Sequence, residues 1–417
     1  MRVQKCKGTR DMSPAEMNRF RLIEGIFRDC CIKGGYQEIR TPTLEYLHLF
    51  TSTGTLTPGK LGKVYSFLDW DGWSGERVVL RPDATIPVAR SYIDTSKASE
   101  LAKLFYVTNV FIFEETGKEN RGIWQCGVEL IGAGSAVADV ELITLALDVL
   151  GKLDLKDVEL KLSHSGLIRA LLTRFGLSPR EQVAVFDRIL DGDKDALSSL
   201  MTKTPELGET LTPLLDLKGQ SPGFLRNLRS LFSRDLPEFE PALNNFIEIA
   251  DILENMGYRY QIDITSGRGF EYYTGIIFEI LAGEERVAGG GRYDDLIPLM
   301  GGPQVPASGF ALGIDHLMGL ISLDTLNGHL PERVLVRTVN SNVDDIRESF
   351  RVSACLRDAG YAAELDLGKE AAADLRWAVD VRSKPPRFSV TDLISRKTSE
   401  VNSADQVVEL LGGDGAD

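Results

Sequence analysis

Cysteine is scarce in this sequence, and its arrangement excludes a disulfide framework. The cysteines are odd in number and include no Cys-x-x-Cys pair. The five residues are Cys6, Cys30, Cys31, Cys126 and Cys355. Small extracellular domains depend on paired cysteines, whereas proteins of a reducing compartment keep them as free thiols. We therefore expect reduced thiols and a cytoplasmic protein.

Long apolar segments are absent as well. No stretch of the sequence approaches the roughly 20 apolar residues that a membrane-spanning helix needs. The start, Met1-Arg-Val-Gln-Lys-Cys-Lys7, continues into charged sequence without the apolar core of a signal peptide. A content of 43% hydrophobic and 26% charged residues is ordinary for a globular protein in water. These features predict no contact with a membrane.

Positive charge is in deficit. The 47 Lys and Arg residues are outnumbered by 61 Asp and Glu residues, which gives a formal net charge of -14 and a pI near 5.0. Proteins that bind the phosphate backbone usually present a basic surface. The charge balance therefore disfavours nucleic acid, tRNA included, as a partner.

Histidine is also rare, with four residues in the chain. His48, His164 and His329 show none of the spacings that are typical of metal ligands. We therefore predict no metal site.

The patterns that are present predict an α+β fold. Apolar residues recur at helical spacing over residues 15–33, which end at Gly34-Gly35, and residues 36–45 alternate like a strand before a short helix ending near Phe50. Further strands are predicted over residues 64–68, 77–80, 104–113, 123–131, 258–264 and 276–281. A helix is predicted over residues 85–92, and a final helix over residues 310–323 follows a loop at residues 289–294. We expect an antiparallel sheet with helices on one side.

Two domains are predicted. Residues 1–330 form the core domain, with a leucine-rich helical insertion over about 166–245. Residues 331–417 form a smaller α/β domain, with strands over residues 334–339 and 362–367 and a helix over residues 343–359. The tail from Gly412 onward is expected to be loose.

Several motifs, taken together and in order, resemble those of the histidyl-tRNA synthetases, a class II family. The matching segments are Lys7-Gly-Thr-Arg-Asp11, Leu80-Arg-Pro-Asp-Ala-Thr85, residues 105–115 with 124–132, Arg268-Gly-Phe-Glu-Tyr-Tyr-Thr-Gly275, Gly289-Gly-Gly-Arg-Tyr-Asp294 and residues 309–317. A Gly-Gly-Gly-Arg segment alone would be weak evidence, because it is as readily a tight turn as a ligand cradle. The resemblance implies a class II antiparallel sheet flanked by helices, self-association as a dimer or higher oligomer, and a shortened anticodon-binding-like domain at the end.

By resemblance, the family's histidine pocket is carried over almost completely. Its members in this sequence are Asp83, Thr85, Gln125, Glu129, Arg268, Tyr272, Tyr273 and Tyr293. The residue types suit an amino acid with a polar ring, because Asp83 and Glu129 can hold an ammonium or an imidazole N–H. The resemblance places Arg268 at the substrate carboxylate. The alternative is structural: a buried carboxylate can simply pair with a nearby arginine, and tyrosines in strands are often core residues.

The activating apparatus of the family is incomplete in this sequence. The two arginines that bind ATP phosphate in the family are replaced by Ile112 and His316. The loop over residues 115–122 has also lost the family's basic character, although Lys118 and Arg121 remain as a possible nucleotide-binding remnant. Removing one such contact commonly costs on the order of a hundredfold in rate. The loss of both predicts no catalytic residues, no required cofactor and no productive binding of Mg-ATP.

A histidine pocket without an activating centre is what the resemblance implies for the synthetase-like regulatory subunits of ATP phosphoribosyltransferase, the first enzyme of histidine biosynthesis. We therefore expect a non-catalytic chain that binds histidine as an effector and joins a short-form catalytic subunit. One alternative is a divergent histidine–tRNA ligase in which Lys118, Arg121 or Arg10 supplies the missing charge. Another is an orphan paralogue that binds a different amino acid or peptide.

Overall fold

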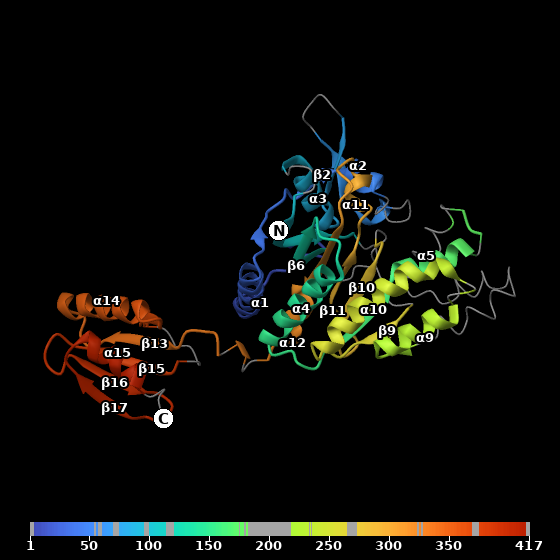
Figure 1. Ribbon diagram of the computed structural model, residues 1–417. Coiled ribbons are helices and arrows are strands. Elements are labelled where there is room, and N and C mark those ends of the chain that lie inside the picture. The colour runs from blue at the N-terminus through green and yellow to red at the C-terminus, as the bar shows by residue number, and fades with distance from the viewer. Residues whose placement is uncertain are drawn as a thin grey trace. The chain divides into compact units, whose positions relative to one another are not determined.

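The computed structural model describes residues 4–53, 56, 61–69, 75–95, 100–113, 121–174, 176–178, 181, 218–232, 234, 236–264, 273–322, 325–326, 328–368 and 375–413. The chain divides into two compact units, Met1–Thr325 and Leu326–Asp417 (Figure 1). Among the described residues, no helix has the length and apolar character needed to cross a lipid bilayer.

A nine-stranded sheet is the centre of the first unit. Its strand order is β1-β5-β6-β12-β11-β10-β7-β9-β8. The strands are β1 (Gln37–Glu38), β5 (Ala102–Phe111), β6 (Gly122–Ile131), β7 (Glu159–His164), β8 (Lys218–Gly219), β9 (Gln261–Asp263), β10 (Ile276–Ala282), β11 (Glu285–Arg292) and β12 (Ala307–Gly313). The central pairs are antiparallel, and among the described strands of this sheet the pairs β1–β5 and β7–β9 are parallel. The α+β class expected from the sequence is confirmed.

The remaining elements of the first unit surround this sheet. The helices are α1 (Pro14–Lys33), α2 (Leu47–Ser52), α3 (Thr85–Thr95), α4 (Ala136–Lys152), α5 (Ser165–Arg174), α9 (Pro222–Phe232), α10 (Glu240–Asn255), α11 (Leu296–Leu299) and α12 (Ile314–Leu320), with the 3-10 turns η1 (Leu61–Lys63) and η2 (Pro237–Phe239). A small sheet of order β2-β4-β3 is built from β2 (Leu44–Tyr46), β3 (Ser66–Leu68) and β4 (Arg77–Leu80).

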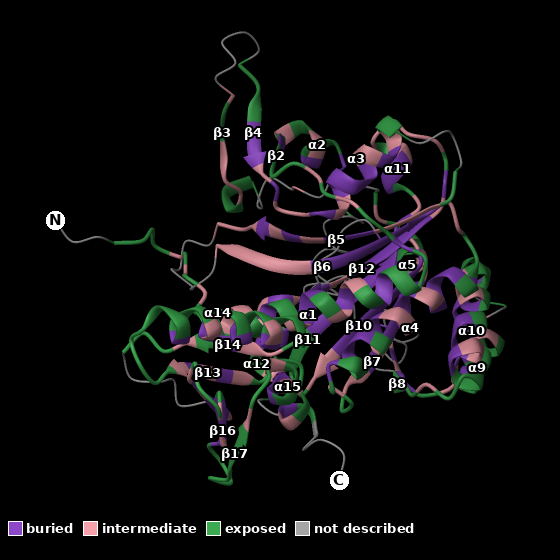
Figure 2. Ribbon diagram, turned by 90° about the vertical axis from the view of Figure 1, so that its left-hand side faces the viewer, coloured by how far each residue is buried: buried purple, intermediate pink, exposed green. Residues whose placement is uncertain are grey.

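The expectation that helices lie on one side of the sheet was wrong. Side chains alternate between the two faces of a strand, so Phe105 and Tyr106 point to opposite sides. Phe105 packs edge-on against Phe27 of α1, at 5.9 Å between ring centroids. Tyr106 packs with Val88 of α3 on the other face. Because both sides of this sheet are apolar, each needs a helical cover (Figure 2).

Two predicted elements near the end of this unit were also wrong. Residues 289–291 do not form a loop but lie in strand β11, and residues 307–313 form strand β12, so that the helix predicted over residues 310–323 is only Ile314–Leu320. Gly290 and Gly291 allow close packing rather than a turn: a Cβ on Gly290 would clash with the carbonyl of Gly309, and a Cβ on Gly291 with the carbonyl of Ile276. Glycine therefore marks a close approach of backbones here.

The described part of the expected helical insertion contains α5, α9, η2 and α10, together with the two-residue strand β8. Residues 182–217, the middle of the expected insertion, lie outside the described residues. Helix α4 was not among the predicted elements. It begins at the N-cap Ser135, whose side chain accepts a hydrogen bond from Ala138 N.

The second unit is a five-stranded sheet of order β14-β13-β15-β16-β17 with two helices. Its elements are β13 (Arg333–Thr338), α14 (Val343–Asp358), β14 (Ala362–Leu365), β15 (Trp377–Val381), β16 (Phe388–Asp392), β17 (Thr398–Val401) and α15 (Ala404–Gly413). The tail predicted to be loose from Gly412 is helical through Gly413, because Val407 and Leu411 of α15 are buried in this unit's core.

Candidate functional site

The candidate pocket residues gather on the α3 face of the large sheet. Gln125, Gly127 and Glu129 alternate with buried apolar residues along β6 and therefore share one face. Tyr106 of β5 stands opposite Gly127 and lies on that same face, because paired residues of neighbouring strands point to the same side. The start of α3 brings Asp83 and Thr85 over this part of the sheet.

Glu129 is the centre of this cluster and is 1% exposed. The Tyr293 hydroxyl donates a hydrogen bond to Oε2 of Glu129, and the Tyr106 hydroxyl lies 3.4 Å from Oε1. The Thr85 hydroxyl contributes a further hydrogen bond to the same carboxyl group. Three hydroxyl groups from separate segments of the chain thus converge on one buried carboxyl group.

Glycines make room for this arrangement. A Cβ on Gly127 would overlap the ring of Tyr106, and a Cβ on Gly309 would clash with the carboxylate of Glu129 and the carbonyl of Val128. The two glycines are required by space, since neither has the positive φ that favours glycine.

Burial controls the charge of the two pocket carboxyl groups. Loss of solvation raises the pKa of Glu129 to about 8, although hydrogen bonds from Tyr293 and Thr85 act in the opposite direction. Asp83 keeps some accessible surface. Desolvation nevertheless raises its pKa to about 6, although the hydrogen bonds that it accepts from backbone N–H groups lower the pKa. Its Oδ1 receives the N–H of Ile86 at 2.9 Å and so caps the first turn of α3.

The structure brings most of the predicted pocket residues together. Tyr273 is 3% exposed and packs with Tyr293 in the core beneath α3. Burial, together with the nearby carboxyl groups of Glu129 and Asp83, raises the pKa of its hydroxyl. Gln125 joins through Tyr106, since its Nε2 lies 3.5 Å from that hydroxyl. Arg268 and Tyr272 lie outside the described residues.

Tyr106 was missed in the sequence. It connects Gln125 to Glu129, and burial together with the nearby carboxylates holds its pKa well above the usual range. Nothing local distinguishes it from a core tyrosine. Only its position opposite Gly127, which strand pairing sets, shows that its ring extends over the site.

The positions of the missing arginines hold no fixed cation. Ile112 is half-buried, and its N–H donates to the carbonyl of Arg121 at 3.0 Å. His316 is exposed on α12, and its Nδ1 lies 3.2 Å from the carbonyl of Arg286. Neither residue supplies the permanent positive charge that a guanidinium gives to a phosphate.

The residues considered as substitutes have other partners or lie outside the described residues. Arg10 pairs with Glu16 at 2.6 Å and with Asp315 at 2.5 Å. The guanidinium of Arg121 lies over the ring of Phe113, at 4.9 Å from its centroid. Lys118 lies outside the described residues.

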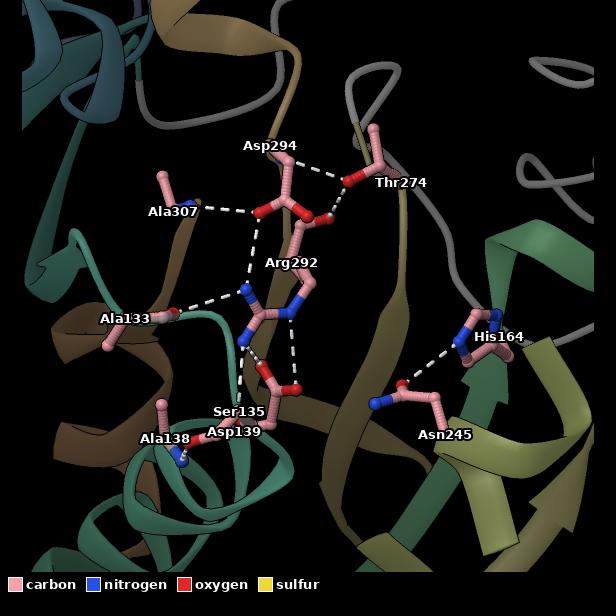
Figure 3. A network of polar contacts seen from close by, with 10 residues as sticks. All are labelled: Ala133, Ser135, Ala138, Asp139, His164, Asn245, Thr274, Arg292, Asp294 and Ala307. Atoms are coloured by element: carbon pink, nitrogen blue, oxygen red, sulfur yellow. Dashed lines mark hydrogen bonds and ion pairs between the residues drawn. The ribbon is translucent and has the colours of Figure 1, made fainter. Parts of the chain in front are cut away.

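Arg292, in the Gly-Gly-Gly-Arg segment, has a structural position. Its Nη2 lies 2.7 Å from Asp139 of α4 in a pair whose side chains are 7% and 1% exposed. Its Nη1 also donates to the Ala133 carbonyl and to Asp294, both at 3.2 Å (Figure 3). The arginine thus joins β11 to the start of α4 and does not face Glu129, because it lies on the opposite face of its strand from Gly291.

The geometry supports recognition more readily than bond formation. Glu129, Tyr106, Tyr293 and Asp83 offer donors and acceptors in a buried setting, where hydrogen bonds to a ligand are strong. A ligand with a ring N–H or an ammonium group would complement the two carboxyl groups.

Comparison with known proteins shows which family of sequences the chain resembles. A family model described as histidyl-tRNA synthetase matches residues 8–317. A protein named ATP phosphoribosyltransferase regulatory subunit from Dehalococcoides mccartyi is 48% identical over 412 residues, which cover 99% of each chain. A histidine–tRNA ligase from Methanocaldococcus jannaschii is 35% identical over 372 residues, 87% of this chain and 86% of that protein.

Solved structures agree on the fold. A structure described as an ATP phosphoribosyltransferase regulatory subunit/histidyl-tRNA synthetase from Bacillus halodurans has a TM-score of 0.74 at 24% identity, covering 90% of this chain and 95% of that one. At this identity the likeness supports the class II fold alone. The family match over three quarters of the length, together with the two sequence relatives, shows that the chain belongs to the histidyl-tRNA synthetase family.

Proposed function

We propose that this chain is a histidine-sensing, non-catalytic regulatory subunit of ATP phosphoribosyltransferase, which catalyses the first step of histidine biosynthesis. The observation that carries the proposal is a contrast within one site. The hydrogen-bonded group of Glu129, Tyr106 and Tyr293 is present, whereas Ile112 and His316 stand where the family resemblance expects phosphate-binding arginines. The 48% identity to a protein named as such a subunit supports the same conclusion.

Histidine is the proposed effector, and no cofactor is required. Glu129 binds the imidazole N–H, while Asp83 and Gln125 hold the ammonium group and Arg268 faces the carboxylate. Histidine regulates the partner only to the extent that it binds one conformer of the complex more tightly than another. The partner is a short-form catalytic subunit, and the chain self-associates as a dimer or higher oligomer in the cytoplasm.

The test is co-expression with a short-form catalytic subunit, followed by measurement of transferase activity against histidine. Wild type should co-purify and confer inhibition, whereas Glu129→Gln should co-purify but require on the order of a hundredfold more histidine, because a buried charged hydrogen bond is lost. Inhibition that is equal in both proteins would count against the pocket. Failure to co-purify would count against the partnership.

A divergent histidine–tRNA ligase is the second candidate, because the chain retains a folded C-terminal unit with its own buried core. Histidine-dependent exchange of pyrophosphate into ATP separates the two functions. The regulatory subunit should bind histidine without exchange, and robust exchange by the unmodified chain would establish the ligase instead.

A further inference from the structure

Helix α14 of the second unit turns a row of apolar side chains to the solvent. Val343, Ile346 and Phe350 are 77%, 40% and 57% exposed. Residues that are three and four positions apart lie on one side of a helix, so these three side chains form a continuous row, the α14 stripe. Ala354, the next residue at this spacing, is also exposed.

The buried side of the same helix is less apolar than the stripe (Figure 2). Val352 and Leu356 reach the core of this unit, but Ser349 and Ser353 are buried beside them, at 1% and 0% exposed. Their hydroxyls donate to the carbonyls of Ile346 and Ser349, at 2.8 and 2.7 Å. A surface helix normally buries its apolar side, whereas α14 buries two serines and exposes a phenylalanine. A contiguous exposed apolar patch of this kind marks an interaction surface.

Charged side chains lie along one flank of the stripe. Each residue turns the helix by about 100°, which places Asp344, Arg347 and Arg351 on the same flank. Arg347 pairs with Asp344 at 3.0 Å, and both side chains are largely exposed. Arg351 is also exposed and lies 3.9 Å from Glu348. The flank is therefore negative near the start of the helix and positive towards its middle.

This order of charges is complementary to itself. In a contact with twofold symmetry, the same patch of two copies meets, and the axis lies perpendicular to two antiparallel helices. With the axis near residues 347 and 348, Ile346 lies beside Phe350 of the second copy. Each flank then faces the same flank of the other helix, so Asp344 lies opposite Arg351 of the second copy, and this pair forms twice. The two Arg347 side chains are nearest the axis, and each keeps its own Asp344 as counter-charge.

We propose that the α14 stripe is an interface with a second copy of this chain, in which two α14 helices pack antiparallel. Phe350 is the apolar anchor at the centre, and the flanking charges select the antiparallel arrangement. A helix of 16 residues is roughly 24 Å long, which is short for an interface of standard size, so we expect a dissociation constant in the micromolar range. The proposal goes beyond the proposed function, because the contact needs neither histidine nor a catalytic subunit and either idea can fail without the other.

The test is sedimentation equilibrium of the full chain, without any other protein, over about 1–100 µM. The average mass of the wild type should rise across this range, whether the species that pairs is one chain or a tighter assembly of chains. Phe350→Glu places a charge at the centre of the stripe and should weaken this assembly about 30-fold or more, as expected for an anchor residue. The mass should then be half that of the assembled wild type.

An exchange of charges tests whether the occupant is a second copy. Asp344→Arg and Arg351→Asp each turn two attractive contacts into repulsive ones, and each should weaken assembly about tenfold. The double variant Asp344→Arg/Arg351→Asp restores both pairs with reversed signs and should recover the wild-type affinity to within about threefold. A different partner protein could not be restored by two changes on this chain alone.

Ile394→Glu is the matched control, because Ile394 is 77% exposed in the same unit but lies between β16 and β17, away from α14. Its mass should equal that of the wild type, and circular dichroism checks that every variant is folded. Equal masses for the wild type and Phe350→Glu would overturn the proposal, as would an equal loss in Ile394→Glu. A double variant without recovery would overturn the assignment to a second copy. Loss of co-purification with a catalytic subunit in Phe350→Glu, at unchanged mass of the chain alone, would give the stripe to that subunit instead.

Discussion

At the residue scale, the carboxyl group of Glu129 dominates the site because it is buried among hydroxyl donors. Its pKa of about 8 means that it holds a proton near neutral pH until a ligand supplies positive charge. The free energy of solvating an ionised carboxylate is lost on burial, and the hydroxyl donors compensate only in part. A cationic or N–H-bearing ligand would supply the positive charge or the hydrogen-bond donor that the ionised carboxylate of Glu129 still lacks.

This pKa predicts how stability depends on pH. The ordinary pKa is 4.5 and the folded value is about 8, so the folded chain holds more protons than the unfolded chain between these limits, and this group lowers stability as pH rises. Glu129→Gln cannot ionise. Urea unfolding of both proteins without ligand should shift in favour of the variant by up to about 1.4 kcal/mol per pH unit from pH 5 to pH 8. A difference that stays constant with pH would contradict this assignment.

The pair of Arg292 and Asp139 gives a second prediction at this scale. Asp139→Asn leaves a buried guanidinium without its main counter-charge, and the free energy of unfolding should fall by about 3 kcal/mol. Asp251→Asn, which removes the partner of the half-exposed Arg226, should cost less than about 1 kcal/mol. Chemical denaturation measures both, and equal costs would show that burial does not govern the pair.

At the scale of elements, Gly309 of strand β12 leaves the space that the side chain of Glu129 on strand β6 occupies. Gly309→Ala would force a methyl group against the carboxylate of Glu129 and the carbonyl of Val128. We expect a loss of about 2 kcal/mol in stability and loss of histidine binding, measured by thermal denaturation and calorimetry.

Gly25→Ala in α1 serves as its control. No atom lies within 4 Å of the added Cβ, and the residue is exposed. The change should stabilise the chain by about 0.5–1 kcal/mol, because alanine favours the helix more than glycine does, and histidine binding should persist. Retention of binding in Gly309→Ala would show that the site tolerates a displaced Glu129.

The elements also show where sequence patterns mislead. The segment 289–294 has the composition of a turn, yet residues 289–292 lie in β11, and the neighbouring backbones leave no room for a side chain at Gly290 and Gly291. The strands predicted at residues 77–80 and 123–131 are confirmed, because runs of apolar and β-branched residues favour a strand locally. A local sequence pattern cannot reveal which strand lies alongside. A glycine that is required by the close approach of a neighbouring strand therefore looks, in the sequence, like a glycine that is required by a turn.

At the scale of the whole molecule, the proposed function predicts that catalysis is not recovered easily. In the double variant Ile112→Arg/His316→Arg, two guanidinium groups return, but the loop over residues 115–122 keeps its altered sequence. We expect little or no histidine-dependent pyrophosphate exchange, because several contacts must act together on the transition state. Robust exchange by the double variant would show that those two positions alone separate this chain from an active ligase.

The sequence by itself determined the family, the α+β class and the identity of most pocket residues, because motifs carry side chains in a fixed local order. Asp83, Thr85, Glu129, Tyr273 and Tyr293 come together in the structure as their motifs implied, and their binding of histidine stays a prediction.

Only the tertiary structure decided which side chains share a surface. It placed Tyr106 between Gln125 and Glu129. It also directed Arg292 away from the pocket to Asp139. The physical reason is that these contacts join segments far apart in the chain, and strand register and the burial of charge, which no local pattern records, determine which partners meet.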